Sequence, residues 1–368
     1  MNKYTKSHGT GYLTLASGEV FSGRLYGAPL NGIGEVVFHT GMTGYQEVMT
    51  DPSFAGQIVT FTYPLIGNYG VNDADFEALA PALSGMVVSE LCEIPSHYRS
   101  QFSLAEIAET FQFPILAGID TRAVTKLVRA TGNVFGVIAD KPLSTLEVAA
   151  YFEKHANRAL VPEVSSSEIV QYPGEREHVV IVDLGMKRSI LNSLRELGCR
   201  VTVVPFHTTL AEIRALHPDG IVFSNGPGDP TELLSYCAEW RKVAESYPTL
   251  GICLGHQLLA LMFGAQTERL PFGHRGSNHP VKDLTTGKVY MTSQNHGYVV
   301  KEETVDKRQL MVTYRNVNDK SVEGLQHLYL PIMSVQFHPE AHPGPDDTSH
   351  VFKQFIQSMN AIGAKHYA

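Results

Sequence analysis

The sequence predicts an α/β protein of two domains, an N-terminal α+β domain followed by a domain built on a mostly parallel sheet. The chain has 368 residues, more than one hydrophobic core usually holds. A polar, serine-rich segment at 163–177, broken by a Pro-Gly pair, is typical of a linker. Strand-like and helix-like runs alternate regularly only after this segment. We therefore expect domains at 1–162 and 178–368, joined by a linker at 163–177.

The N-terminal part combines short β-rich runs, glycine turns and two candidate helices. The runs 11–15 and 35–38 predict strands, and 104–111 and 122–131 predict helices. Basic side chains share one side of the second candidate helix. This pattern could bind a partner, but it is more typical of a solvated helix face.

A β-α-β alternation fills the part after the linker. The expected strands are 178–183, 200–205, 220–223, 249–252 and 331–336, and the expected helices are 186–197, 231–246 and 254–263. Such an alternation predicts a parallel sheet with helices on its faces. Ligands of such sheets bind at the carboxyl ends of the strands, so the residues just after these strands are the candidates for function.

The composition argues against several classes of function. A formal net charge of -8 gives no basic face for nucleic acid. The N-terminal stretch lacks the apolar core of a secretory signal, and the longest apolar run, 258–263, is far shorter than the roughly 20 residues that cross a bilayer. The four cysteines show no CxxC spacing, which argues against a disulfide framework and a zinc site. We expect a cytoplasmic protein that binds neither nucleic acid nor membrane.

One cysteine stands between an expected strand and an expected helix. Gly251-Ile-Cys253-Leu-Gly255 has the G-x-nucleophile-x-G arrangement of the α/β-hydrolase elbow, with sulfur in place of the hydroxyl. A sharp strand-to-helix turn strains the nucleophile's backbone, and flanking glycines remove side chains that would clash. The helix start favours a thiolate, and the Leu254 N–H would lie where an oxyanion forms. Alone, the motif also fits a buried structural cysteine.

Gln336-Phe-His338-Pro-Glu340 follows the last expected strand and supplies the base and the orienting group that a thiolate nucleophile needs. Pro339 biases His338 toward an extended conformation. Residues two apart in an extended segment project to the same side, so Glu340 can reach the imidazole. By itself His338 also fits a surface histidine, but together with the elbow it predicts a Cys253, His338 and Glu340 triad.

Other motifs raise the questions of nucleotide and metal binding. The segment 224–230, SNGPGDP, lies at the same sheet edge, where small residues let backbone amides approach a ligand, although an ordinary turn has this composition too. It lacks the lysine and hydroxyl of a phosphate loop. Histidines gather at 338, 342 and 350, and at 274 and 279 in an expected glycine-rich loop, but no spacing matches a ligand pair. We expect no metal in this chain.

The C-terminal domain resembles class I glutamine amidotransferases. The resemblance rests on four motifs in order, SNGPGDP at 224–230, GICLGHQ at 251–257, QNHGY at 294–298 and HPE at 338–340. It implies a flavodoxin-like α/β fold with a Cys-His-Glu triad that hydrolyses glutamine through a glutamyl thioester.

The N-terminal part narrows the resemblance. Residues 34–72 and GIDTRAVTKLVR at 118–129 resemble the small subunit of carbamoyl phosphate synthetase, whereas the related domains of GMP synthetase or anthranilate synthase carry no such leading domain. The resemblance implies that ammonia passes internally to a large partner subunit. That subunit would bind ATP and Mg and make carbamoyl phosphate from bicarbonate for arginine and pyrimidine synthesis.

The resemblance also implies a set of residues that hold L-glutamine. They match Ser53, Gly226, Gly228, Leu254, Gln257, Asn295, Gly297 and Tyr298. Phenylalanine also occurs in the family at the position of Tyr298, and a contact through the backbone would tolerate the change.

Three alternatives are weighed against this assignment: a glutaminase subunit for another synthetase, a free-standing γ-glutamyl peptidase, and a regulatory binding subunit with a dead catalytic site. The N-terminal resemblance argues against the peptidase. The intact Cys253, His338 and Glu340 argue against the binding subunit.

Overall fold

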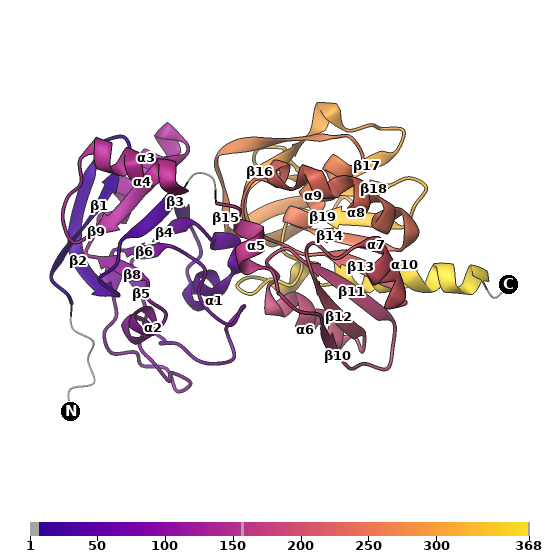
Figure 1. Cartoon of the computed structure of the whole chain (residues 1–368), viewed down its shortest axis with the longest axis horizontal. Coiled ribbons are helices and arrows are strands. Elements are labelled where there is room, and N and C mark those ends of the chain that lie inside the picture. Colours follow the sequence, from indigo (N-terminus) through magenta and orange to yellow (C-terminus); the bar gives the residue numbers. More distant parts are fainter. Residues whose placement is uncertain (1–6, 156–157, 367–368) are drawn as a thin grey trace. The chain divides into compact units, whose positions relative to one another are not determined.

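The computed structural model describes residues 7–155 and 158–366. The chain divides into two compact units, Met1–Arg158 and Ala159–Ala368, and each is described by itself. Figure 1 shows the barrel strands of the first unit in indigo and purple and the larger sheet of the second unit from magenta to yellow. Among the described residues, no helix combines the length and the apolar character needed to span a membrane.

The first unit is a closed barrel in the strand order β1-β2-β8-β6-β4-β3-β9. Neighbours β3, β4, β6 and β8 run parallel, and the other pairs are antiparallel. The barrel strands are β1 (Thr10–Leu15), β2 (Val20–Gly27), β3 (Gly32–His39), β4 (Gln57–Phe61), β6 (Gly85–Val88), β8 (Pro114–Ala117) and β9 (Val134–Ala139). A separate short pair joins β5 (Leu65–Ile66) to β7 (Glu90–Leu91).

Alternate side chains of the barrel strands fill its core. One set contributes from all seven strands to a single cluster, including Leu13, Leu25, Val36, Ile58, Val87, Leu116 and Ile138. The opposite set, with Val59 and Ile115, packs against α1 (Tyr45–Thr50), α2 (Leu104–Thr110) and the 3-10 turn η1 (Pro52–Phe54). The helix α3 (Thr121–Thr131) contributes to the first cluster, and α4 (Thr145–His155) packs against β9. The predicted α+β character of this part is confirmed.

The second unit contains a ten-stranded sheet in the order β10-β12-β11-β13-β14-β19-β18-β17-β15-β16. The five strands from β12 to β19 in this order are parallel. They are β11 (His178–Asp183), β12 (Arg200–Pro205), β13 (Gly220–Phe223), β14 (Thr249–Ile252) and β19 (Ile332–Val335). The predicted parallel strands are confirmed, and their continuous β-branched runs are typical of strands buried on both faces. The other strands of the sheet pair antiparallel.

Helices cover both faces of this sheet. One buried cluster joins α7 (Leu210–Ala215), α8 (Leu234–Ser246) and α9 (Leu254–Met262) to the sheet. A second cluster joins α6 (Arg188–Glu196) and α10 (His350–His366) to it. The remaining helical segments are α5 (Leu160–Val164), η2 (Pro230–Leu233), η3 (Glu302–Thr304) and η4 (Asp346–Thr348).

The segment 163–177, assigned to a linker from its composition, contains a strand of the sheet. β10 (Val170–Tyr172) pairs antiparallel with β12 at the sheet edge. The boundary between the two compact units lies before this segment in the chain, between Arg158 and Ala159. Three residues with alternating pattern are too few to reveal a strand beside the serine run and Pro173.

The antiparallel part of the sheet contains the longest strands, which the sequence did not reveal. These are β15 (Gln266–Asp283) and β16 (Val289–Lys301), next to β17 (Leu310–Asn316) and β18 (Val322–His327). The expected glycine-rich loop around His274 and His279 is therefore wrong, since both lie in β15. Two register shifts between β15 and β16 accommodate the glycines and the proline there.

Candidate active site

The backbone of Cys253 confirms the expected strained turn. The residue lies between β14 and α9 with φ 54 and ψ -104, a conformation that L-residues rarely adopt. Its N–H donates to the carbonyl of Val335 on the neighbouring strand at 2.9 Å. The side chain is buried, and Sγ lies 3.6 Å from the carbonyl oxygen of Asn295.

The two glycines of the motif are required by close packing. A Cβ on Gly251 would lie 2.6 Å from the carbonyl oxygen of Gly255, and a Cβ on Gly255 would clash with the carbonyl of Phe223. The Gly255 N–H donates to the carbonyl of Ser224 at 3.1 Å, which ties the start of α9 to the next loop of the sheet edge. Leu254 is the first residue of α9, a position whose N–H has no acceptor within the helix.

His338 and Glu340 follow β19, which lies beside β14 in the sheet. The His338 Nδ1–H donates to Oε1 of Glu340 at 2.6 Å, and the His338 N–H donates to the carbonyl of Ser293 at 2.9 Å. Both side chains are buried, at 2% and 0% exposure. The expected orientation of the histidine by the carboxylate is present in the structure.

Lys187 is a partner of this pair that the sequence did not reveal. Its Nζ donates to Oε1 of Glu340 at 3.1 Å and to the carbonyl of Ala341 at 2.6 Å, and its side chain is only 3% exposed. The Lys187 N–H donates to Oδ1 of Asn225 at 3.0 Å. The position of Lys187 just after β11, at the carboxyl edge of the sheet, could have indicated this role. The sequence instead predicted that the residue belongs to the start of a helix.

Charges around the triad set the proton affinities. Burial lowers the pKa of His338, but the Glu340 charge and the Cys253 thiol outweigh it, so the net shift is upward from 6.5. Burial raises the pKa of Glu340, but Lys187 and His338 outweigh it, so the net shift is downward from 4.5. The electrostatics favour a charged imidazole held by a charged carboxylate.

Nε2 of His338 is buried and makes no hydrogen bond by geometry, although the Cys253 thiol is close enough to raise the histidine's pKa. Hydrogen bonds between a nucleophile and its base are often long before substrate binds, so this arrangement is compatible with proton transfer between the two side chains. The nitrogen that faces the thiol is thus available for proton transfer.

The loop of Gly226 and Gly228 is built tightly against the same edge. A Cβ on Gly226 would clash with the carbonyl of Leu184, and Gly228 has φ 90, so neither position suits a side chain. The Ser224 hydroxyl accepts the N–H of Leu184 at 3.0 Å and holds the loop in place.

The other residues predicted to hold glutamine are described unit by unit. Gln257 donates from Nε2 to the carbonyl of Tyr298 at 2.7 Å and to Oε1 of Gln336 at 3.0 Å. Asn295 and Gly297 belong to β16, and the Asn295 carbonyl contacts the Cys253 sulfur. In the first unit, the Ser53 N–H donates to Oδ1 of Asp51 at 2.9 Å, which fixes the buried serine in η1.

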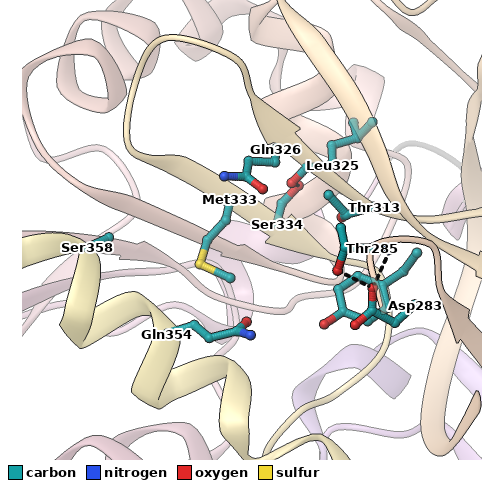
Figure 2. Close-up of a pocket in the computed structure, with 10 residues that line it drawn as sticks. Asp283, Thr285, Thr313, Leu325, Gln326, Met333, Ser334, Gln354 and Ser358 are labelled. Atoms are coloured by element: carbon teal, nitrogen blue, oxygen red, sulfur yellow. Dashed lines mark hydrogen bonds between the residues drawn. The ribbon is translucent and has the colours of Figure 1, made fainter. Parts of the chain in front are cut away.

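A separate cavity of about 290 Å³ lies between α10 and strands β17 to β19. Figure 2 shows Gln354 and Ser358 of α10 facing Met333, Gln326 and the strand residues opposite. None of the triad residues lines it, so it does not mark the chemistry of the elbow.

Comparison with known proteins covers both units. Residues 13–138 match the model of the carbamoyl-phosphate synthase small chain, CPSase domain, and residues 180–358 match that of glutamine amidotransferase class-I. The arginine-specific small chain of carbamoyl phosphate synthase from Halalkalibacterium halodurans is 51% identical over 97% of this chain and 99% of its own.

Two proteins of Bacillus subtilis are similarly close. An arginine-specific small chain is 49% identical over 95% of this chain and 97% of its own, and a pyrimidine-specific one is 48% identical over 94% and 95%. With a barrel unit and an amidotransferase unit that both match, the chain belongs to the family of carbamoyl phosphate synthase small chains, which carry a class-I glutamine amidotransferase domain.

Proposed function

We propose that this chain is the glutaminase subunit of a glutamine-hydrolysing carbamoyl phosphate synthase, with Cys253 as nucleophile, His338 as acid and base, and Glu340 as the orienting group. The observation that carries the proposal is the elbow itself. A buried cysteine at φ 54 starts a helix, beside a buried histidine whose other ring nitrogen is held by a carboxylate. Such an arrangement serves acyl transfer.

In the proposed reaction, His338 already holds the proton given up by the Cys253 thiol, in keeping with the raised pKa of the histidine, and the Cys253 sulfur attacks the side-chain amide carbon of glutamine. The oxyanion accepts from the Leu254 N–H and from an amide of the loop 226–228. His338 then gives its proton to the departing nitrogen, which leaves as ammonia, and a γ-glutamyl thioester remains. Water attacks the thioester with His338 as base, which releases glutamate and restores the thiol.

The substrate contacts in this proposal are Ser53, Gly226, Gly228, Leu254, Gln257, Asn295, Gly297 and Tyr298. Gln257 supports the segment 295–298, since it donates to the Tyr298 carbonyl. The ammonia passes to a large synthetase subunit that binds ATP and Mg and makes carbamoyl phosphate from bicarbonate. Relatives named for arginine and for pyrimidine synthesis are almost equally similar, so the similarity favours neither pathway over the other. A cytoplasmic location keeps the thiol reduced.

The test is Cys253→Ala in the complex that a tagged copy of this chain forms in its own cells. Glutamine-dependent carbamoyl phosphate synthesis should be lost, while synthesis from added ammonia should continue at the wild-type rate. Loss of both would contradict the division of labour. Glutamine-dependent synthesis that survives the substitution would support a regulatory binding subunit instead.

A further inference from the structure

A cluster of buried polar side chains lies in the antiparallel part of the sheet, beside the residues proposed to hold glutamine. This histidine cluster consists of His274 on β15, Gln294 and His296 on β16, Asp319 in the turn after β17, and Glu323 on β18. Glu323 has 0% exposure and the His274 side chain 10%. Asp319 is half-exposed, but the other four residues are buried, and burying polar groups costs free energy unless every group is paired.

Both ring nitrogens of His274 face acceptors. Nε2 lies 2.7 Å from Oδ2 of Asp319, and Nδ1 lies 3.2 Å from Oε1 of Gln294 and 3.6 Å from Oε1 of Glu323. A ring that donates from both nitrogens carries two protons and a positive charge. Burial lowers the pKa of His274, but Asp319 and Glu323 outweigh it and raise the pKa to about 9.

The cluster connects His274 to the segment 295–298 through two neighbours. Oε1 of Gln294 lies 2.6 Å from Nε2 of His296, and His296 Nδ1–H donates to the carbonyl of Tyr298 at 2.8 Å. That same carbonyl accepts from Gln257. The charged histidine and the glutamine segment are therefore joined by consecutive hydrogen bonds.

A second connection runs through Glu323. Its Oε2 accepts from Nε2 of Gln294 at 3.1 Å, and its Oε1 accepts from Asn316 at 3.1 Å. Its backbone carbonyl accepts the N–H of Gln336 at 2.9 Å, and Gln336 in turn accepts from Gln257. Both connections end at Gln257.

Two features of the surroundings of His296 have opposite effects on its protonation. Both its ring nitrogens face carbonyl oxygens, yet burial first and the His274 charge second lower its pKa well below 6.5.

The same side chains also have the chemistry of metal ligands, since His274, His296 and Glu323 each offer an atom within 4.8 Å of the others. A metal ligand must present a lone pair, whereas His274 offers N–H groups to two carboxylates and an amide. We therefore assign the positive charge of the cluster to the His274 imidazolium and not to a bound metal ion.

We propose that His274 is a positioning residue for glutamine: clamped as an imidazolium between Asp319 and Glu323, it holds Gln294 and His296, and through them the segment 295–298 and Gln257. This inference rests on the proposed function, because it assigns to these residues the binding of glutamine. Loss of the charge loosens the segment before substrate binds, so it raises KM and leaves kcat nearly unchanged.

The test measures glutamine hydrolysis by the complex of this chain with its large subunit. His274→Gln keeps a hydrogen-bonding amide but removes the charge, and it should raise KM for glutamine about five- to tenfold near neutral pH, with kcat within about twofold. Asp319→Asn, at a half-exposed position, should give a smaller rise in the same direction and covers the case in which His274→Gln does not fold. His279→Gln is the matched control, since the His279 ring packs against the His274 ring with centroids 5.0 Å apart but is not one of the links between His274 and Gln257.

The pH dependence separates positioning from a merely structural role. The charge on His274 is present below its pKa and is lost as pH rises through about 9, so the KM ratio between His274→Gln and wild type should close above that pH. The charged or titratable neighbours of His274 are Asp319, Glu323, His279 and His296. Burial and then the His274 charge lower the pKa of His279 to about 4, so it does not titrate in this range.

Three results would overturn the inference: an unchanged KM in His274→Gln, a constant KM ratio across pH, or one equivalent of zinc in the purified complex by elemental analysis. Failure of the proposed function gives a different result. In that case the wild-type complex itself does not hydrolyse glutamine, or Cys253→Ala hydrolyses it as fast as wild type.

Discussion

Two buried histidines of the second unit, His338 and His274, each donate to a carboxylate, yet they differ in their other ring nitrogen. Nε2 of His338 makes no hydrogen bond and faces the Cys253 thiol. Both nitrogens of His274 are occupied, by Asp319 and by Gln294. A histidine with one nitrogen held and one available can move a proton, whereas one with both held can only support its neighbours.

Substitution of His338, the histidine with the available nitrogen, is expected to have the largest effect on glutamine hydrolysis. His338→Asn should lower glutamine hydrolysis by roughly a thousandfold or more, because it removes both the base and the acid of the proposed mechanism. Ammonia-dependent carbamoyl phosphate synthesis by the complex is the internal control and should not change. A variant that retains a tenth of the wild-type rate would mean that His338 is not the proton carrier.

A smaller effect is expected at its orienting carboxylate. Glu340→Gln keeps an oxygen that can accept from His338 but removes the charge, so kcat should fall roughly a hundredfold. The pKa of His338 should fall as well, since the Glu340 charge is what raises it against burial. Steady-state kinetics and an NMR titration of the imidazole measure the two changes; a fall in kcat without a change in titration would leave Glu340 with a purely geometric role.

Lys187 is the third charged side chain of the buried group that it forms with Glu340 and His338. Lys187→Met leaves Glu340 with one cationic neighbour fewer, and it should lower kcat about tenfold and cost about 3–5 kcal/mol of stability, the usual loss when one partner of a buried pair is removed. Lys242→Met is the matched control, because Lys242 forms an exposed pair with Glu239 worth less than about 1 kcal/mol. Equal effects of the two substitutions in kinetics and urea unfolding would refute a special role for Lys187.

His256 is a third buried histidine, and it can be compared with His338. One ring nitrogen lies 2.8 Å from Oγ of Ser334 and the other makes no hydrogen bond, but in the part of the chain that the structure describes the partner is a hydroxyl and not a carboxylate. Burial lowers its pKa to about 3, so it stays neutral at physiological pH and does not qualify as a base that cycles its charge.

This lowered pKa predicts the smallest effect, on stability alone. The unfolded chain binds the His256 proton below about pH 6.5 and the folded chain does not, so His256 lowers stability by about 1.4 kcal/mol per pH unit as pH falls from 6.5 toward 3. His256→Gln should flatten that part of the stability curve and leave glutamine hydrolysis nearly unchanged. Urea unfolding at several pH values would show it, and an identical slope in both proteins would argue against a neutral buried His256.

The sequence predicted the parallel strands and the triad because both follow from local patterns. Continuous β-branched runs end at glycine or polar residues, and the cysteine and histidine motifs each follow such a run. The strands 178–183, 200–205, 220–223 and 249–252 agree with β11 to β14 residue for residue.

Other features could not be predicted from local sequence patterns. Lys187 and Glu340 are far apart in the chain and meet only because their strands lie in one sheet. The histidine cluster depends on the pairing of β15 with β16 and on the turn after β17, while the glycines and proline of β15 suggested a loop. Long antiparallel strands with register shifts carry no clear alternation, so the cross-strand meeting of His274, His296 and Glu323 was not predicted.

The central claim, that the available nitrogen of His338 serves a thioester on Cys253, can be tested most directly by mass spectrometry of the complex quenched during turnover of glutamine. The account predicts a γ-glutamyl adduct on the peptide that contains Cys253, and no adduct in Cys253→Ala. Turnover of glutamine with no adduct on Cys253, together with activity that survives Cys253→Ala, would contradict it.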